Sequence, residues 1–190
     1  MFDLPCAILA GGKSSRMGRD KSRLPFGKYQ TLLEYQYHRL SPLFTTTIIS
    51  SKQKNLLQAP HIQDHISNTH APMIALYSLL KQLDSVFVIA VDMPFVDVEQ
   101  IERLVDAHRG GNFDISVAQD SSGIHPLCAI YNNTALPQIR VMLAQHNYRL
   151  TDLLNNLNTK QVLFEQNSGF INLNYYHEYK KIFAKNTTLQ

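Results

Sequence analysis

Short apolar runs alternate along the chain with segments in which apolar residues recur at helical spacing. Six runs predict β-strands, because each is short and either rich in β-branched residues or continuously apolar. The predicted strands cover residues 6–10, 46–50, 86–91, 114–118, 127–131 and 161–164. The run at 86–91 has no polar residue, which is typical of a parallel strand buried on both faces.

Helical patterns fall between these strands. Thr31 is followed three residues later by Glu34, the spacing of a capping box, and Asp97 can cap a further helix. The predicted helices begin near residues 31, 72, 98, 135, 151 and 174. This alternation predicts an α/β fold with a mostly parallel sheet covered by helices on both faces. Since no repeat or linker interrupts the pattern, residues 1–190 are expected to form a single domain.

Composition narrows the classes of function. The chain has 190 residues with 44% hydrophobic and 17% charged residues, which is ordinary for a globular protein. Its net charge of +3 is small and no basic stripe stands out, so we expect no nucleic-acid binding. The sequence shows no membrane-length apolar stretch and no signal peptide, so a cytoplasmic location is expected, with Cys6 and Cys128 as reduced thiols.

The first predicted strand ends abruptly at Gly11 and Gly12. A strand that stops at two glycines leaves backbone N–H groups free, and no side chains block the approach of a phosphate or a base. Arg16 and Lys21 follow and supply the positive charge that a triphosphate requires. The segment therefore predicts a nucleotide-binding loop.

Two other glycine motifs resemble this segment only in part. Residues 7–14 fit a relaxed P-loop pattern, but most of the residues between its ends belong to the strand, which disfavours a P-loop. The spacing of the glycines also does not match the dinucleotide-binding fingerprint.

Asp92 directly follows the buried run at 86–91. Ligands of open α/β sheets bind beyond the carboxyl ends of strands, where Gly11 is also expected. Magnesium bound to phosphates takes one or two protein carboxylates. Because Asp97 is the better helix cap, Asp92 is the candidate metal ligand.

These features, in this order and over nearly the whole chain, resemble the molybdenum cofactor guanylyltransferases of the MobA type. The resemblance begins with the glycine segment and continues with the sequence around Asp92. Its other elements are Leu24, Gly27, Leu33-Glu34, His125-Pro126, Tyr148-Arg149 and Phe170-Ile171-Asn172-Leu173-Asn174.

The resemblance implies a Rossmann-like three-layer sandwich of the nucleotidyltransferase type. It also implies transfer of GMP from GTP to the terminal phosphate of the molybdopterin cofactor, with magnesium and with release of pyrophosphate. Arg16, Lys21 and Asp92 are then the catalytic residues, and Asp92 is the magnesium ligand. The implied nucleotide contacts are Leu9, Ala10, Gly11, Gly12, Lys21, Ser50, Asp64 and Asp92.

The acceptor side is predicted more weakly by the same resemblance. Asn172 and Asn174 match an Asn-x-Asn element near the metal and the acceptor. His125 either orients the acceptor or caps an element, and Arg149 either binds an acceptor phosphate or is a surface residue. Transient protein partners that deliver the cofactor are also expected.

Some residues depart from the family pattern. Ser50 stands where asparagine is common, Ala71-Pro72 where Gly-Pro is usual, and Tyr175-Tyr176 where Thr-Pro is usual. A related transferase that uses CTP or a sugar-phosphate acceptor, and a nucleotide-binding module without catalysis, therefore remain alternatives. Gly11 leaves more room beside a purine than the alanine typical of the cytidylyltransferases, which favours GTP.

Overall fold

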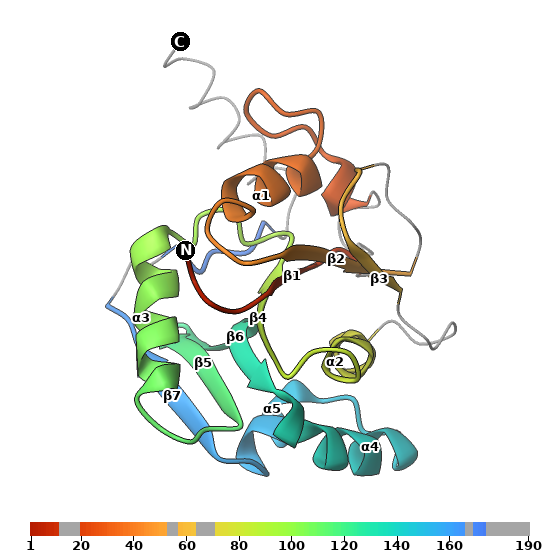
Figure 1. Cartoon of the computed structure of the whole chain (residues 1–190), viewed down its shortest axis with the longest axis vertical. Coiled ribbons are helices and arrows are strands. Elements are labelled where there is room, and N and C mark those ends of the chain that lie inside the picture. Colours follow the sequence, from red (N-terminus) through yellow and green to blue (C-terminus); the bar gives the residue numbers. More distant parts are fainter. Residues whose placement is uncertain (12–19, 53–56, 64–70, 166–168, 174–190) are drawn as a thin grey trace.

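The computed structural model describes residues 1–11, 20–52, 57–63, 71–165 and 169–173. They form one seven-stranded sheet with the order β3-β2-β1-β4-β6-β5-β7 (Figure 1). The strands are β1 (Cys6–Leu9), β2 (Thr47–Ser51), β3 (His61–Gln63), β4 (Ser85–Ala90), β5 (Ile115–Asp120), β6 (Gly123–Asn132) and β7 (Thr159–Leu163). Only β6 runs against its neighbours β4 and β5; every other pair of neighbouring strands is parallel.

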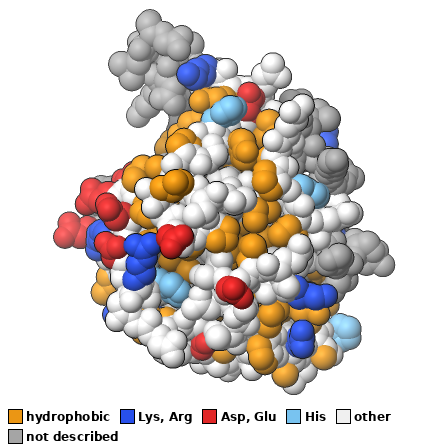
Figure 2. Space-filling view, viewed as in Figure 1, with side chains coloured by type: hydrophobic (Ala, Val, Ile, Leu, Met, Phe, Trp, Pro, Cys, Tyr) orange, Lys and Arg blue, Asp and Glu red, His pale blue; other side chains and the backbone are white. Residues whose placement is uncertain are grey.

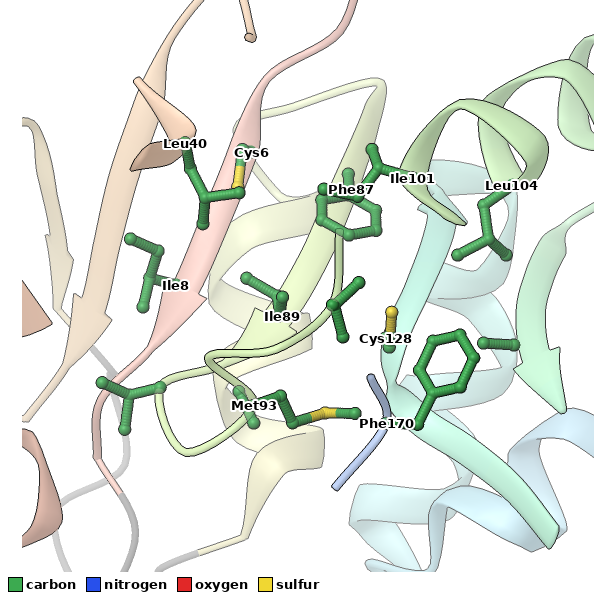
Figure 3. Close-up of a cluster of buried hydrophobic side chains, with 14 of the residues drawn as sticks. Cys6, Ile8, Leu40, Phe87, Ile89, Met93, Ile101, Leu104, Cys128 and Phe170 are labelled. Carbon is green, nitrogen blue, oxygen red and sulfur yellow. The ribbon is translucent and has the colours of Figure 1, made fainter. Parts of the chain in front are cut away.

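Helices cover both faces of this sheet, as the alternating pattern predicts. They are α1 (Leu32–Leu40), α2 (Pro72–Leu80), α3 (Val98–Arg109), α4 (Leu136–Ala144) and α5 (Leu150–Asn155). Helices α1 and α3 share a core with the side chains of Ile8 and Phe87 (Figure 3). Helices α2, α4 and α5 share another core with Ala7 and Val88, the strand neighbours that point to the opposite face. The predicted three-layer α/β sandwich is confirmed.

The helices begin where their capping residues predict. The Thr31 hydroxyl accepts a hydrogen bond from the Glu34 N–H at 3.0 Å. Asp97 and Gln100 form a reciprocal capping box at the start of α3, with bonds of 2.8 and 3.0 Å. Such caps satisfy N–H groups that have no partner within the helix, so the sequence locates these two helix starts well.

Two strands differ from the prediction. The predicted strands do not include β3, because three residues of mixed polarity at a sheet edge carry no hydrophobic pattern. Strand β6 begins at Gly123, four residues before the predicted start, and its pairing with β5 shifts register between Val117 and Ala118. A polar strand start that pairs across an irregularity cannot be recognised from alternation alone. The predicted helix at 174–183 lies outside the described residues.

The surface in Figure 2 carries mixed charge over α3, where acidic and basic side chains lie close together. In the described ranges, no helix combines the length and apolar composition of a membrane span. Cys6 and Cys128 are free thiols in the core beneath α1 and α3, and burial raises the pKa of both.

The sheet contains a topological switch point between β1 and β4. From β1 the chain order runs through β2 to β3 on one side, whereas β4 begins the other side. The carboxyl ends of β1 and β4 therefore meet where the crossover connections diverge, the usual ligand position in open α/β sheets. Gly11 and Asp92 both lie just beyond this edge.

At the opposite edge, α3 contributes a half-buried histidine. The Nδ1 of His108 lies 2.8 Å from the Ser116 hydroxyl and its Nε2 lies 3.2 Å from Asn132 Oδ1. Burial lowers the pKa of His108 below its ordinary value of 6.5, against an opposing contribution from the Asn132 hydrogen bond. The folded protein therefore resists protonation of this ring more than the unfolded chain does.

We expect His108 to make the protein less stable in mild acid. Because its folded pKa is depressed, its contribution is complete above the unfolded pKa and is lost as the pH falls through 6.5 toward the folded pKa. Urea unfolding of the wild type and of His108→Gln at several pH values measures this. The free energy of unfolding of the wild type should fall more steeply between about pH 7.5 and about pH 5.5 than that of the variant. Parallel pH profiles would contradict the assignment.

Candidate active site

An ion pair joins the two segments that the sequence predicts to face each other. The Lys21 Nζ lies 2.7 Å from Asp92 Oδ2, and the two side chains are 15% and 19% exposed. Lys21 opens a short 3₁₀ helix (Lys21–Arg23), which Asp20 caps by accepting the Ser22 N–H at 3.0 Å. Residues 71 positions apart thus place opposite charges in contact at the carboxyl edge of the sheet.

The glycine segment lies beside this pair because β1 and β4 are in register. Leu9 is opposite Ala90, so that Gly11 and Asp92 both follow two residues later. The sheet ladder continues past the strands, with the Val91 N–H donating to the Leu9 carbonyl at 3.1 Å and the Ala10 N–H donating to the Ser50 carbonyl at 2.9 Å. The main chain therefore leaves the ladder at Gly11, which is partly exposed.

Residues 169–173 cross the same edge and touch the loop that follows β4. The Leu173 N–H donates to the Asp92 carbonyl at 2.9 Å. Gly169 approaches the main chain so closely that a Cβ atom there would overlap the Phe95 carbonyl. Phe170 is buried between these two contacts. Asn172, a predicted acceptor residue, is exposed and adjacent to Leu173.

His125 lies at the same edge, inside β6, so it does not cap a helix. Its ring stacks on Phe170, with centroids 4.9 Å apart and planes at 20°. Its Nε2 lies 3.0 Å from Asp120 Oδ1 at the end of β5. Among the described residues, no group meets this Nε2 with hydrogen-bond geometry, so the approach to Asp120 is a close contact only. Asp120 was not identified from the sequence, although its position at a strand end could have pointed to it.

The other predicted residues are more scattered. Ser50 is buried in β2, where its carbonyl holds Ala10. Arg149 is exposed at the start of α5, and its backbone N–H donates a hydrogen bond to Asn147 Oδ1 at 3.1 Å. Four predicted residues lie outside the described residues: Gly12, Arg16, Asp64 and Asn174.

Comparison with known proteins identifies the family of the chain. Residues 6–162 match the family model described as the MobA-like NTP transferase domain. The chain belongs to this family. A match over most of the chain includes both β1 with its glycine segment and β4 with Asp92.

Relatives within the MobA-like family extend the match to nearly full length. The chain is 34% identical over 185 residues to the molybdenum cofactor guanylyltransferase of Helicobacter pylori (strain G27), covering 94% of this chain and 90% of that protein. It is also 34% identical over 187 residues to the molybdenum cofactor guanylyltransferase of Campylobacter jejuni (strain RM1221), covering 96% and 97%.

A solved structure supports the fold. The molybdopterin-guanine dinucleotide biosynthesis protein A of Archaeoglobus fulgidus superposes with a TM-score of 0.83 at 21% identity, covering 98% of this chain and 100% of that one. The two proteins therefore share their fold although most of their residues differ.

The donor set of this MobA-like site suits magnesium bound to a nucleotide better than a dedicated metal cage. The described residues contain no group of three or more His, Cys, Asp or Glu side chains arranged to hold a metal. Magnesium bound to phosphates, however, needs only one or two protein carboxylates and completes its shell with phosphate oxygens and water. Asp92 offers such a carboxylate, partly exposed at the ligand edge. The residues present fit this kind of magnesium binding.

We expect Gly169→Ala to destabilise the protein by about 1–3 kcal/mol, the usual effect of overpacking. The new methyl group must displace residues 169–173 or the main chain at Phe95. Urea unfolding measures the change. Gly110→Ala is the matched control, because a Cβ there meets only ordinary contacts at 3.5 Å. Equal stability of the two variants would show that the close approach at Gly169 is not required.

Proposed function

We propose that this chain is a molybdenum cofactor guanylyltransferase, which transfers GMP from GTP to the terminal phosphate of molybdopterin and releases pyrophosphate. The observation that carries the proposal is the Lys21–Asp92 contact of 2.7 Å beside Gly11. The family membership and two guanylyltransferase relatives at 34% identity support the substrates.

On the nucleotide side, the Lys21 ammonium would attract phosphate oxygens, and the Asp92 carboxylate would hold a magnesium ion bound to the nucleotide. The two charges are opposite and adjacent, which matches a metal–triphosphate, since this ligand also combines both signs. Arg16 is assigned to the same phosphates. The main chain of Leu9, Ala10, Gly11 and Gly12 contacts the nucleoside, with Ser50 and Asp64 nearby. Because the Ala10 N–H is already bonded to Ser50, Gly11 is the first residue with a main chain clear of the ladder.

The reaction is an in-line displacement at the α-phosphorus of GTP. An oxygen of the acceptor phosphate forms the new P–O bond, and the bond to the β-phosphate oxygen breaks, so that pyrophosphate leaves with the electron pair. The acceptor phosphate is already ionised near neutral pH, so no side chain has to remove a proton. Lys21 and Arg16 align the reactants and stabilise the developing negative charge, which magnesium also neutralises when bound.

The acceptor is assigned to the neighbouring part of the edge. The His125 ring stacks on Phe170, and the exposed Asn172 follows Phe170 by two residues in the 169–173 segment. Asn174 and Arg149 are further candidates from the sequence. We assign residues 1–190 to one nucleotidyltransferase domain in the cytoplasm that receives its acceptor from transient protein partners.

We expect GTP, and not CTP, to support pyrophosphate release with magnesium and molybdopterin. The purine preference follows from the small Gly11 beside the expected base position, and the two relatives support it. A coupled pyrophosphate assay with GTP, CTP and UTP measures it. Turnover with CTP alone, or with a sugar phosphate as acceptor, would establish the alternative transferase. Tight GTP binding without any turnover on molybdopterin would establish a non-catalytic module.

We expect Asp92→Ala to lower turnover by about 10²–10³, the usual loss on removal of one electrostatic partner of a transition state. The same assay at saturating GTP and magnesium measures it, with thermal unfolding to show that the variant folds. Asp106→Ala, an exposed aspartate on α3, is the control and should retain full turnover. Near-normal turnover of Asp92→Ala would remove this carboxylate from the mechanism.

A further inference from the structure

Two polar side chains of α1 lie beneath the loop that carries Asp92, here called the Asp92 loop (residues 90–96). The Gln36 side chain is fully buried, and its Nε2 donates to the Val91 carbonyl at 3.1 Å and to the Ala90 carbonyl at 3.4 Å. These carbonyl groups belong to the residues directly before Asp92. A buried amide group whose N–H donors both bind one loop holds that loop in place relative to the helix.

Arg39, one turn further along α1, binds the other half of the loop. Its Nη1 donates to the Val96 carbonyl at 2.6 Å and its Nη2 donates to the Met93 carbonyl at 3.4 Å. Its Nε donates to Gln36 Oε1 at 2.6 Å, which links the two side chains. The linked pair therefore contacts carbonyl groups on both sides of Asp92.

The surroundings of Arg39 are unusual for an arginine. Its guanidinium lies 5.8 Å from the centre of the Tyr35 ring and is desolvated enough that burial lowers the pKa of Arg39. Within the described part of the chain, no carboxylate lies within ion-pair distance of it, although the more distant Asp97 carboxylate offsets part of the lowering of its pKa. Burying a charge without a close ion-pair partner is unfavourable, and an apolar residue in such a place often gives a more stable protein. Core stability alone is therefore a poor explanation for Arg39.

The remaining contacts of the Asp92 loop show what this arrangement achieves. Toward β1, the Val91 N–H donates a hydrogen bond to the Leu9 carbonyl. Toward the 169–173 segment, the Asp92 carbonyl accepts a hydrogen bond from the Leu173 N–H. Gln36 and Arg39 hold the loop from below. Figure 3 shows Met93 of this loop near Phe170, in the core beneath α1 and α3. The main chain around Asp92 is thus fixed on three sides, while its carboxylate meets Lys21.

We propose that Gln36 and Arg39 are positioning residues, which hold the Asp92 loop so that the Asp92 carboxylate lies where a nucleotide-bound magnesium ion requires it. The inference rests on the proposed metal role of Asp92. Neither side chain touches a substrate; both act through the main chain of the loop, as supporting groups around metal ligands commonly do.

Arg39→Met tests the inference through magnesium-dependent nucleotide binding. Calorimetric titration of the full chain with GTP in excess magnesium should show binding weakened by roughly 10–100-fold, the usual effect of losing a supporting group of a metal site. Titration with GTP in EDTA should change by less than about 2-fold, because the glycine segment and Lys21 are unaltered. Gln36→Met, which is close in size, should give the same pattern. Arg39→Lys keeps the charge but not the fork of donors, so its affinity should fall between wild type and Arg39→Met.

His108→Leu is the stability control, because it breaks a buried polar contact at the opposite edge of the sheet. The titrations are done at a temperature well below the thermal unfolding midpoint of every variant. Under these conditions His108→Leu should bind magnesium and GTP like the wild type. If Arg39→Met and Gln36→Met bind like His108→Leu, or lose affinity equally with and without magnesium, the positioning role is wrong.

Asp92→Ala completes a double-mutant cycle that separates the two proposals. If Arg39 acts through Asp92, then Arg39→Met added to Asp92→Ala should cause little further loss of magnesium-dependent binding. Full additivity would overturn the inference. If Asp92→Ala alone leaves magnesium-dependent binding intact, the proposed role of Asp92 fails, and the inference fails with it. If only Asp92→Ala has an effect, the role of Asp92 stands and the inference alone fails.

Discussion

The parallel pairing of β1 with β4 is the constraint on which the site depends. It sets Leu9 opposite Ala90, and the ladder then continues for one more residue before both chains leave the sheet. Because both strands are buried on both faces, a slip in register would move apolar side chains out of two cores at once. The core therefore fixes the distance between the glycine segment and Asp92, although neither of them belongs to it.

The loop after β4 combines a firmly held main chain with a partly exposed carboxylate, that of Asp92. Its carbonyl groups are bound by α1 and by the 169–173 segment, whereas the Asp92 side chain points to the ligand edge and meets Lys21. Sites on loops gain precision when the surrounding structure satisfies the main chain, because few alternative conformations remain. In this protein, the largely desolvated guanidinium of Arg39 satisfies two carbonyl groups of the loop.

The proposed acceptor side depends on aromatic packing instead. Phe170 lies between the ring of His125 and Phe164, so that a segment distant in sequence is anchored through one buried side chain. Gly169 permits the close approach that precedes it. The proposed metal ligand Asp92 and the proposed acceptor residue His125 thus lie along a single edge, and the 169–173 segment contacts both.

The sequence by itself determined the α/β class, most strands and helix starts, and the prominence of Gly11, Lys21 and Asp92. These features depend on local rules: apolar runs, capping residues and strand-end chemistry extend over a few neighbouring residues. The short β3 and the start of β6 could not be predicted, because pairing with neighbouring strands, and not their own composition, makes these residues strands. Only the tertiary structure decided that Gln36 and Arg39 support Asp92 and that Asp120 lies beside His125, since a side chain's partner across the fold depends on register and packing that no local pattern encodes.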